Sequence, residues 1–229
     1  AHISLGMIKY FNDWDWVGAE KCFLKVFEKN PNSAETHQYY AMLLTTLGYH
    51  KKALKEAELA HQIDPLNPPI SYILSFVYFN NNQTEQAIAQ QQKTIELDPD
   101  FGDSQNSMAW MYLRSNQYDK AIEVFNKILN NPNNILQAKA GLAFAYAKLG
   151  QKDRALEFLQ KAENEQLKSP TLELELAIVY TGLSEFDQAI DSLHKAIDKR
   201  LGGLNFINGK FWKELHEHPR FKEILKRMN

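Results

Sequence analysis

An alanine recurs every 34 residues along this chain, and this spacing constrains the fold more strongly than any other feature. The six copies are Ala19, Ala53, Ala87, Ala121, Ala155 and Ala189. Nine residues before each copy stands a large side chain, at Tyr10, Leu44, Tyr78, Tyr112, Tyr146 and Tyr180. Three residues earlier again, most copies have a small residue, in the column Met7, Ala41, Ser75, Ala109, Ala143 and Ala177. A fixed period of this length predicts a repeat protein in which stacked units share a continuous core.

Within each period, the apolar spacing predicts two helices joined by a short turn. Residues 171–197, for example, contain two runs with apolar side chains at helical spacing. Small residues in the alanine column let the two helices of a pair approach closely. Gly48 and Gly150 stand where a first helix must stop. Asn82 and Ser184 are each followed three residues later by an acidic residue, so we expect them to cap second helices.

The pattern resembles the tetratricopeptide repeat, whose motif has small residues, Tyr, Ala, Phe and Pro at these spacings. The early copies end in Asn-Pro or Asp-Pro, at Pro31, Pro65, Pro99 and Pro132, whereas the last two copies lack that proline and no copy has the motif's early Trp. The resemblance covers about residues 1–203 and implies an all-α fold, a right-handed α-solenoid of six helix-turn-helix repeats. We expect these repeats at about 1–33, 34–67, 68–101, 102–135, 136–169 and 170–203, with a helical cap at 204–229.

Three stretches carry a narrower resemblance: NDWDWVGAE at 12–20, the segment 30–68, and HPRFKEILKRM at 218–228. They look like the tetratricopeptide tail of certain bacterial multidomain regulators, in which the tail follows a winged-helix domain, a protein kinase or a nucleotide cyclase. That family usually closes with Asp-Pro-Arg-Phe, whereas His218 replaces the Asp here. The resemblance implies the sensory or docking part of a larger signalling or transcription protein. Because the chain opens with Ala rather than Met, we expect it to be a processed or excised part of such a protein.

Composition indicates a protein of a reducing compartment that has no general affinity for polyanions. The formal net charge is −2, so no global field attracts nucleic acid or an anionic membrane. Cys22 is the single cysteine, which excludes an internal disulfide framework. The sequence contains neither an 18-residue apolar run nor a signal peptide at its start. We therefore expect a cytoplasmic location and no membrane partner.

The closing stretch NGKFWKELHEHPRFKEILKRMN combines hints of phosphate binding, of a metal site and of simple helix packing. The spacing from Gly203 to Gly209 and the Phe after Lys210 do not fit a phosphate-binding loop. His216 and His218 lie two residues apart, on different faces of a helix, and have no cysteine nearby. We expect a turn between two short amphipathic helices that covers the last repeat. No nucleophile stands in a recognisable pattern with a base, so we expect no catalysis, no metal and no cofactor.

The resemblance places function in a concave groove lined by the first helix of each pair, which in this family binds extended peptides or helices. Eleven residues before the alanines, the groove column reads Ile8, Met42, Phe76, Trp110, Phe144 and Ile178. The residues that we expect to bind a partner are Tyr39, Met42, Tyr72, Phe76, Phe79, Asn80, Trp110, Arg114, Phe144 and Lys148. Stacked apolar and aromatic side chains favour an apolar peptide, a helix or an adjoining effector domain over an acidic chain terminus. Any one of them could instead pack between neighbouring repeats.

Two other functions stay open from the sequence. The chain could be a structural protein that forms a homo-oligomer through the groove or an end surface. It could also regulate an enzymatic domain that is absent from this chain. In each case the partner is a protein or a peptide.

Overall fold

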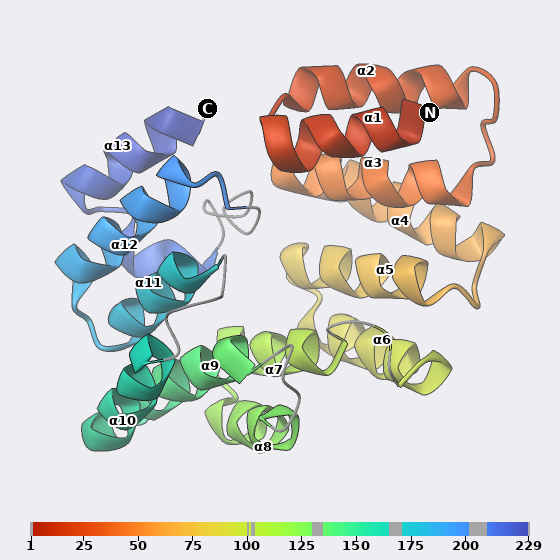
Figure 1. Cartoon of the computed structure of the whole chain (residues 1–229). Helices are drawn as coiled ribbons and strands as arrows, with labels where there is room; N and C mark the ends of the chain where they lie inside the picture. Colours follow the sequence, from red (N-terminus) through yellow and green to blue (C-terminus); the bar gives the residue numbers. More distant parts are fainter. Residues whose placement is uncertain are drawn as a thin grey trace. The chain divides into compact units, whose positions relative to one another are not determined.

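The computed structural model describes residues 2–99, 101, 104–129, 135–164, 171–201 and 210–228. Every regular element in these ranges is a helix, and they contain no strand (Figure 1). The contacts divide the chain into two compact units, residues 1–104 and 105–229, each of which is described by itself. The all-α architecture of repeated helix pairs that the sequence predicts is confirmed.

Unit 1 contains three helix pairs. The first is α1 (His2–Ile8), which continues as the π-helix η1 (Lys9–Asp13), and α2 (Trp16–Phe27); the second is α3 (Ala34–Thr46) and α4 (His50–Ile63); the third is α5 (Pro68–Asn80) and α6 (Thr84–Leu97). The two helices of each pair pack against each other, and α3 also packs against α2 and α5. The first helices of the second and third pairs therefore lie side by side (Figure 1).

Unit 2 continues the alternation. Its helices are α7 (Ser104–Arg114), of which Ser104 belongs to unit 1, α8 (Tyr118–Ile128), α9 (Ile135–Lys148), α10 (Lys152–Asn164), α11 (Leu172–Gly182) and α12 (Phe186–Asp198). A short 3-10 helix η3 (Lys210–Leu215) and α13 (Pro219–Met228) follow. The first helices α9 and α11 pack against each other, η3 packs against α11, and α13 packs against α12.

The alanine column explains why the paired helices lie so close. All six alanines are completely buried, at 0% exposure. In the column three residues before the aromatic one, Ala41, Ser75, Ala109, Ala143 and Ala177 are also at 0%. Since only a methyl or hydroxymethyl group separates the backbones at these positions, the helices of a pair can approach closely.

A left-handed residue ends the first helix of every repeat, again at an interval of 34 residues. These residues have φ between 56° and 78° and are Trp14, Gly48, Asn82, Asn116, Gly150 and Ser184. In the last five repeats the next residue donates its backbone N–H to the carbonyl oxygen five residues earlier, at 2.8 to 2.9 Å. The accepting residue is the aromatic-column residue, for example Tyr180 for the N–H of Glu185. This hydrogen bond satisfies a carbonyl that a helix end leaves exposed.

The expected capping role of Asn82 and Ser184 is therefore wrong. Both residues end the preceding helix, because the turn requires a positive φ that Asn adopts more readily than most residues. The N-cap positions of α6 and α12 are Gln83 and Glu185, and neither side chain makes a capping hydrogen bond. Gly48 and Gly150 end α3 and α9 at this column, as predicted.

Candidate functional site

The predicted groove residues of unit 1 lie on the adjacent helices α3 and α5. Tyr39 and Met42 are on α3, and Met42 is buried with 8% of its surface exposed. Four aromatic side chains, which we call the aromatic strip, are partly exposed: Tyr39, Tyr72, Phe76 and Phe79. Asn80 is also partly exposed, but its amide nitrogen donates to the Phe76 carbonyl oxygen at 2.8 Å. Unit 1 thus presents aromatic side chains from two neighbouring first helices, with Asn80 held to its own helix.

A hollow of about 300 Å³ adjoins one end of the aromatic strip. It lies between the first turns of α3 and α5 and is lined by Ala34, Glu35, Gln38, Tyr39, Asp64, Asn67, Pro69 and Ile70. Burial, together with the charge of Glu35, raises the pKa of the Tyr39 hydroxyl above its ordinary value. The phenol is therefore neutral at physiological pH and can donate a hydrogen bond to a bound chain.

The predicted groove residues of unit 2 are more deeply engaged within the protein. The Trp110 ring packs edge-on against Phe125, with 5.4 Å between ring centroids. Phe144 is only 6% exposed and belongs to the same buried cluster as Phe125. Burial lowers the pKa of Arg114 to about 10, so its guanidinium group stays charged at neutral pH. Much of this set supports the core of unit 2, which was the alternative left open by the sequence.

The C-terminal segment, formed by η3 and α13, reaches one of these groove positions. Lys148 on α9 donates from Nζ to both carboxylate oxygens of Glu214 on η3, at 2.7 and 2.9 Å. The same ammonium group lies 5.4 Å from the centroid of the Phe144 ring. Trp212 and Leu215 of η3 are buried, at 5% and 0% exposure. Lys148, predicted as a contact for a partner, is thus held by the protein's own C-terminal segment.

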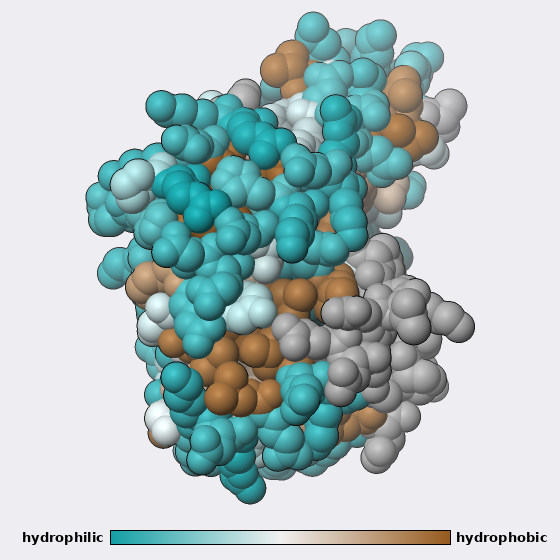
Figure 2. Space-filling model, turned by 60° about the vertical axis from the view of Figure 1, so that its left-hand side comes forward, coloured by the Kyte–Doolittle hydropathy of each residue, from teal (hydrophilic) through white to brown (hydrophobic). Residues whose placement is uncertain are grey.

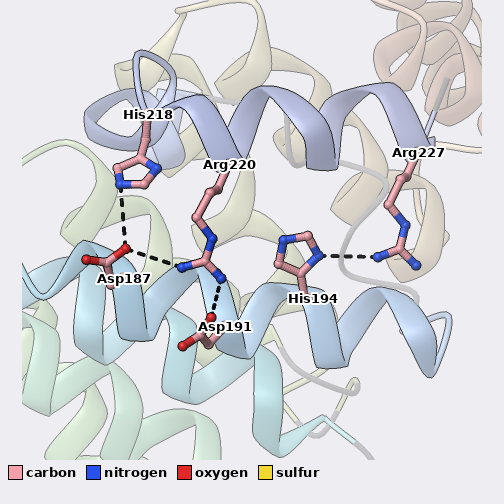
Figure 3. A network of polar contacts seen from close by, with 6 residues as sticks. All are labelled: Asp187, Asp191, His194, His218, Arg220 and Arg227. Carbon is pink, nitrogen blue, oxygen red and sulfur yellow. Dashed lines mark hydrogen bonds and ion pairs between the residues drawn. The ribbon is translucent and has the colours of Figure 1, made fainter.

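The His-Glu-His stretch and the helix after it form polar contacts with α12 (Figure 3). The Arg220 guanidinium donates to Asp187 at 3.2 Å and also to Asp191, while His218 Nε2 lies 3.8 Å from Asp187. Further along α13, Arg227 donates to Asp198 at 2.7 Å and its Nη1 lies 3.2 Å from Nδ1 of His194. Beneath these pairs, Phe221 and Ile224 are fully buried. In the described part of the segment, α13 covers α12 as the expected cap would.

These contacts leave the two terminal histidines in packing roles. The His216 ring stacks on Phe221 with 5.5 Å between centroids, and His218 faces Asp187. Among the residues that the structure describes, no three His, Cys, Asp or Glu side chains come together as metal ligands would. The stretch from Gly203 to Gly209, which the sequence tested for phosphate binding, lies outside the described residues.

Apolar side chains also reach the surface outside these positions. In the view of Figure 2, hydrophilic residues predominate, and hydrophobic ones gather in one area in the lower half. An apolar area framed by polar residues is typical of surfaces that bind other proteins. No helix in the described ranges is long and apolar enough to cross a membrane.

Two family models match the chain, and both describe tetratricopeptide repeats. The model of the Psidin N-terminal TPR repeats region matches residues 106–218, and the general tetratricopeptide repeat model matches residues 68–101. No curated protein sequence matches the chain significantly.

Solved structures of tetratricopeptide proteins resemble the chain over most of its length. The structure of PilW, a type IV pilus biogenesis factor, is 15% identical and has a TM-score of 0.66, covering 98% of this chain and 96% of its own. Pseudomonas aeruginosa PilF is 17% identical with a TM-score of 0.62, covering 99% and 96%. A thermophilic TPR protein of Thermus thermophilus is 19% identical with a TM-score of 0.65, covering 80% and 97%. At these identities the likeness concerns the fold alone. From the six-fold column of buried alanines, the repeated left-handed turns and these matches, we conclude that the chain is a tetratricopeptide repeat protein.

Proposed function

We propose that this chain is a non-catalytic interaction module that binds an apolar peptide or helix along the aromatic strip of unit 1. Tetratricopeptide repeat proteins are generally scaffolds that bind other proteins through the surfaces of their stacked helices. The observation that carries the proposal is the partial exposure of Tyr39, Tyr72, Phe76 and Phe79 on two adjacent first helices. Aromatic side chains dominate binding energy at protein interfaces, because they bury a large apolar area with few rotatable bonds.

Unit 1 is a better candidate than the corresponding positions of unit 2. In unit 2, Phe144 is nearly fully buried and Lys148 is paired with Glu214. A partner at these positions would have to displace the C-terminal segment and leave the Lys148 charge without its counter-ion. The aromatic strip has no such cost, since its rings already face solvent in part.

The occupant that we propose is amphipathic, with apolar anchors at helical or alternate spacing. It belongs either to a separate protein or to an effector domain of the same polypeptide, as the resemblance to regulator tails implies. The hollow beside Tyr39 would receive the end of such a segment, with the phenol donating to one of its carbonyl groups.

The test replaces Phe76 and Phe79 by Ser and measures capture of partners from a lysate of the source cells. The matched control is Tyr49→Ser, because Tyr49 is 55% exposed and stands in the turn before α4 rather than on the strip. We expect the double variant to lose a partner that the wild type and the control retain, while its circular dichroism is unchanged. A photo-reactive group at position 76 should then cross-link to that partner. Equal capture by all three folded proteins would refute the assignment of the strip.

A further inference from the structure

The outward face of α2, the second helix of the first repeat, is apolar where a solvated helix should be polar. Val17 is 63% exposed and Leu24 is 45% exposed. Seven residues separate them, so they lie two turns apart on the same face, with Lys21 between them. The opposite face buries Ala19, Cys22 and Phe23 against the rest of the repeat. We call Val17, Lys21 and Leu24 the α2 stripe.

The other repeats show that the fold does not require apolar residues at these positions. In the column of Val17 they have Lys51, Glu85, Asp119, Asp153 and Asp187, and in the column of Leu24 they have Glu58, Gln92, Asn126, Gln160 and His194. All ten of these side chains are exposed or partly exposed. Because five repeats fold with polar residues at both positions, packing within the repeat does not explain Val17 and Leu24. A surface that is apolar against its own repeat pattern is expected to be covered by a partner.

The column between them departs from the pattern in the opposite sense. Glu20 stands where the other five repeats have Leu54, Ile88, Ile122, Leu156 and Ile190. Its carboxylate accepts a hydrogen bond from the Tyr40 hydroxyl at 3.0 Å, which fixes the position of the charge beside the stripe. Lys21 is exposed and adjacent in sequence. The centre of α2 therefore has one anion and one cation, flanked by an apolar residue on each side.

We propose that a second copy of this chain covers the α2 stripe, with the two α2 helices antiparallel about a two-fold axis near residues 20 and 21. Residues at equal distances on either side of that axis then face each other across the interface. Val17 of each copy meets Leu24 of the other, and Glu20 of each copy lies opposite Lys21 of the other. The stripe is self-complementary in both apolar contact and charge, as an isologous interface must be.

The size of the stripe makes this a weak association. A helix of 12 residues is about 18 Å long, and the contact is smaller than the roughly 1,600 Å² of a standard interface. We therefore expect a dissociation constant on the order of 100 µM. Such an equilibrium is concentration-dependent and is independent of the aromatic strip on α3 and α5.

The main experiment is sedimentation equilibrium of the whole chain from about 5 to about 500 µM. The variant is Val17→Asp with Leu24→Gln, since Asp and Gln are residues that other repeats carry in these columns. We expect the wild type to move from monomer to dimer over this range and the variant to associate at least tenfold more weakly. The control Leu66→Gln removes a residue that is 75% exposed in the turn before α5, and it should leave association unchanged.

A charge swap tests the antiparallel register. Glu20→Lys places lysine opposite Lys21, and Lys21→Glu places glutamate opposite Glu20, so each single change should weaken association. The double change Glu20→Lys, Lys21→Glu restores opposite charges and should recover part of it. A wild type that stays monomeric throughout the range, or a stripe variant that dimerises as well as the wild type, overturns the proposal. Phe76→Ser should leave self-association unchanged, so failure of either proposal can be recognised separately.

Discussion

Glu175 offers the sharpest test of the structure, because a carboxyl group is buried inside a repeat at the start of α11. Only 5% of its surface is exposed. Burial raises the pKa of this carboxyl group from its ordinary value of 4.5 to about 7, against the opposing effect of a hydrogen bond to Thr171. Its Oε2 atom finds no hydrogen-bond partner in the described part of the chain. The folded protein therefore favours the neutral acid, whereas the unfolded chain ionises at its ordinary pKa.

The pKa difference fixes both the sign and the size of the effect on stability. Between pH 4.5 and about 7 the folded state holds a proton that the unfolded state has released. The free energy of unfolding is therefore highest, with respect to this group, below pH 4.5, and it falls as the pH rises to about 7. At about 1.4 kcal/mol per unit of pKa difference, ionisation of Glu175 costs about 3 kcal/mol of stability above pH 7.

Glu175→Gln removes the ionisation while keeping the shape of the side chain. We expect the variant to be up to about 3 kcal/mol more stable than the wild type at pH 8, and roughly equal to it near pH 4.5. Urea unfolding followed by circular dichroism over this pH range measures the difference, and the titration of all other groups cancels between the two proteins. Glu223→Gln, exposed on α13, is the control and should follow the wild-type profile. A stability difference between Glu175→Gln and wild type that does not change with pH would refute the assigned environment.

Three further changes test the helix contacts. Gly141→Ala would place a methyl group 2.2 Å from the buried Phe125 ring, so we expect a loss of about 2 kcal/mol in urea unfolding, and unaltered stability would contradict the packing of α9 on α8. Ser184→Gly relieves a residue with a φ of 61° and should raise stability by about 1 kcal/mol in the same assay; a decrease would argue against the left-handed turn. Arg220→Ala removes the pairs to two aspartates of α12, so amide exchange in α13 should become faster, and this difference should shrink in about 0.5 M NaCl; equal exchange rates in the two proteins would exclude these pairs as an anchor.

The helix pairs could be predicted from the sequence because their causes repeat every 34 residues. A buried alanine, an aromatic residue before it and a left-handed turn between them recur in all or nearly all copies, so a change in one copy does not hide the period. Asn82 and Ser184 were misplaced because a Ser or Asn before an acidic residue has the same local pattern at a cap and at a turn. Comparison with Gly48 and Gly150, which occupy the same column, would have revealed the turn.

The candidate site was less predictable, because exposure depends on contacts between segments far apart in sequence. The column that places Phe76 on a partly exposed surface places Phe144 in the core of unit 2. Lys148 is paired with Glu214, 66 residues further along the chain, and no periodicity indicates that pair. The pattern can therefore name the positions that face a groove, while the tertiary contacts decide which of them remain available to a partner.

The repeats also supply an internal reference for judging individual residues. Because equivalent positions have similar neighbours in every copy, a residue that departs from its column requires a local explanation. For Gln91, which stands where Phe23 and Phe125 stand in other copies, the explanation is complete: its amide nitrogen donates to the Ser104 carbonyl oxygen at 2.9 Å and its oxygen accepts from Ser75 at 2.6 Å. For Val17 and Leu24 no contact within the repeat provides one, and this difference is the reason to look for their partner outside the chain.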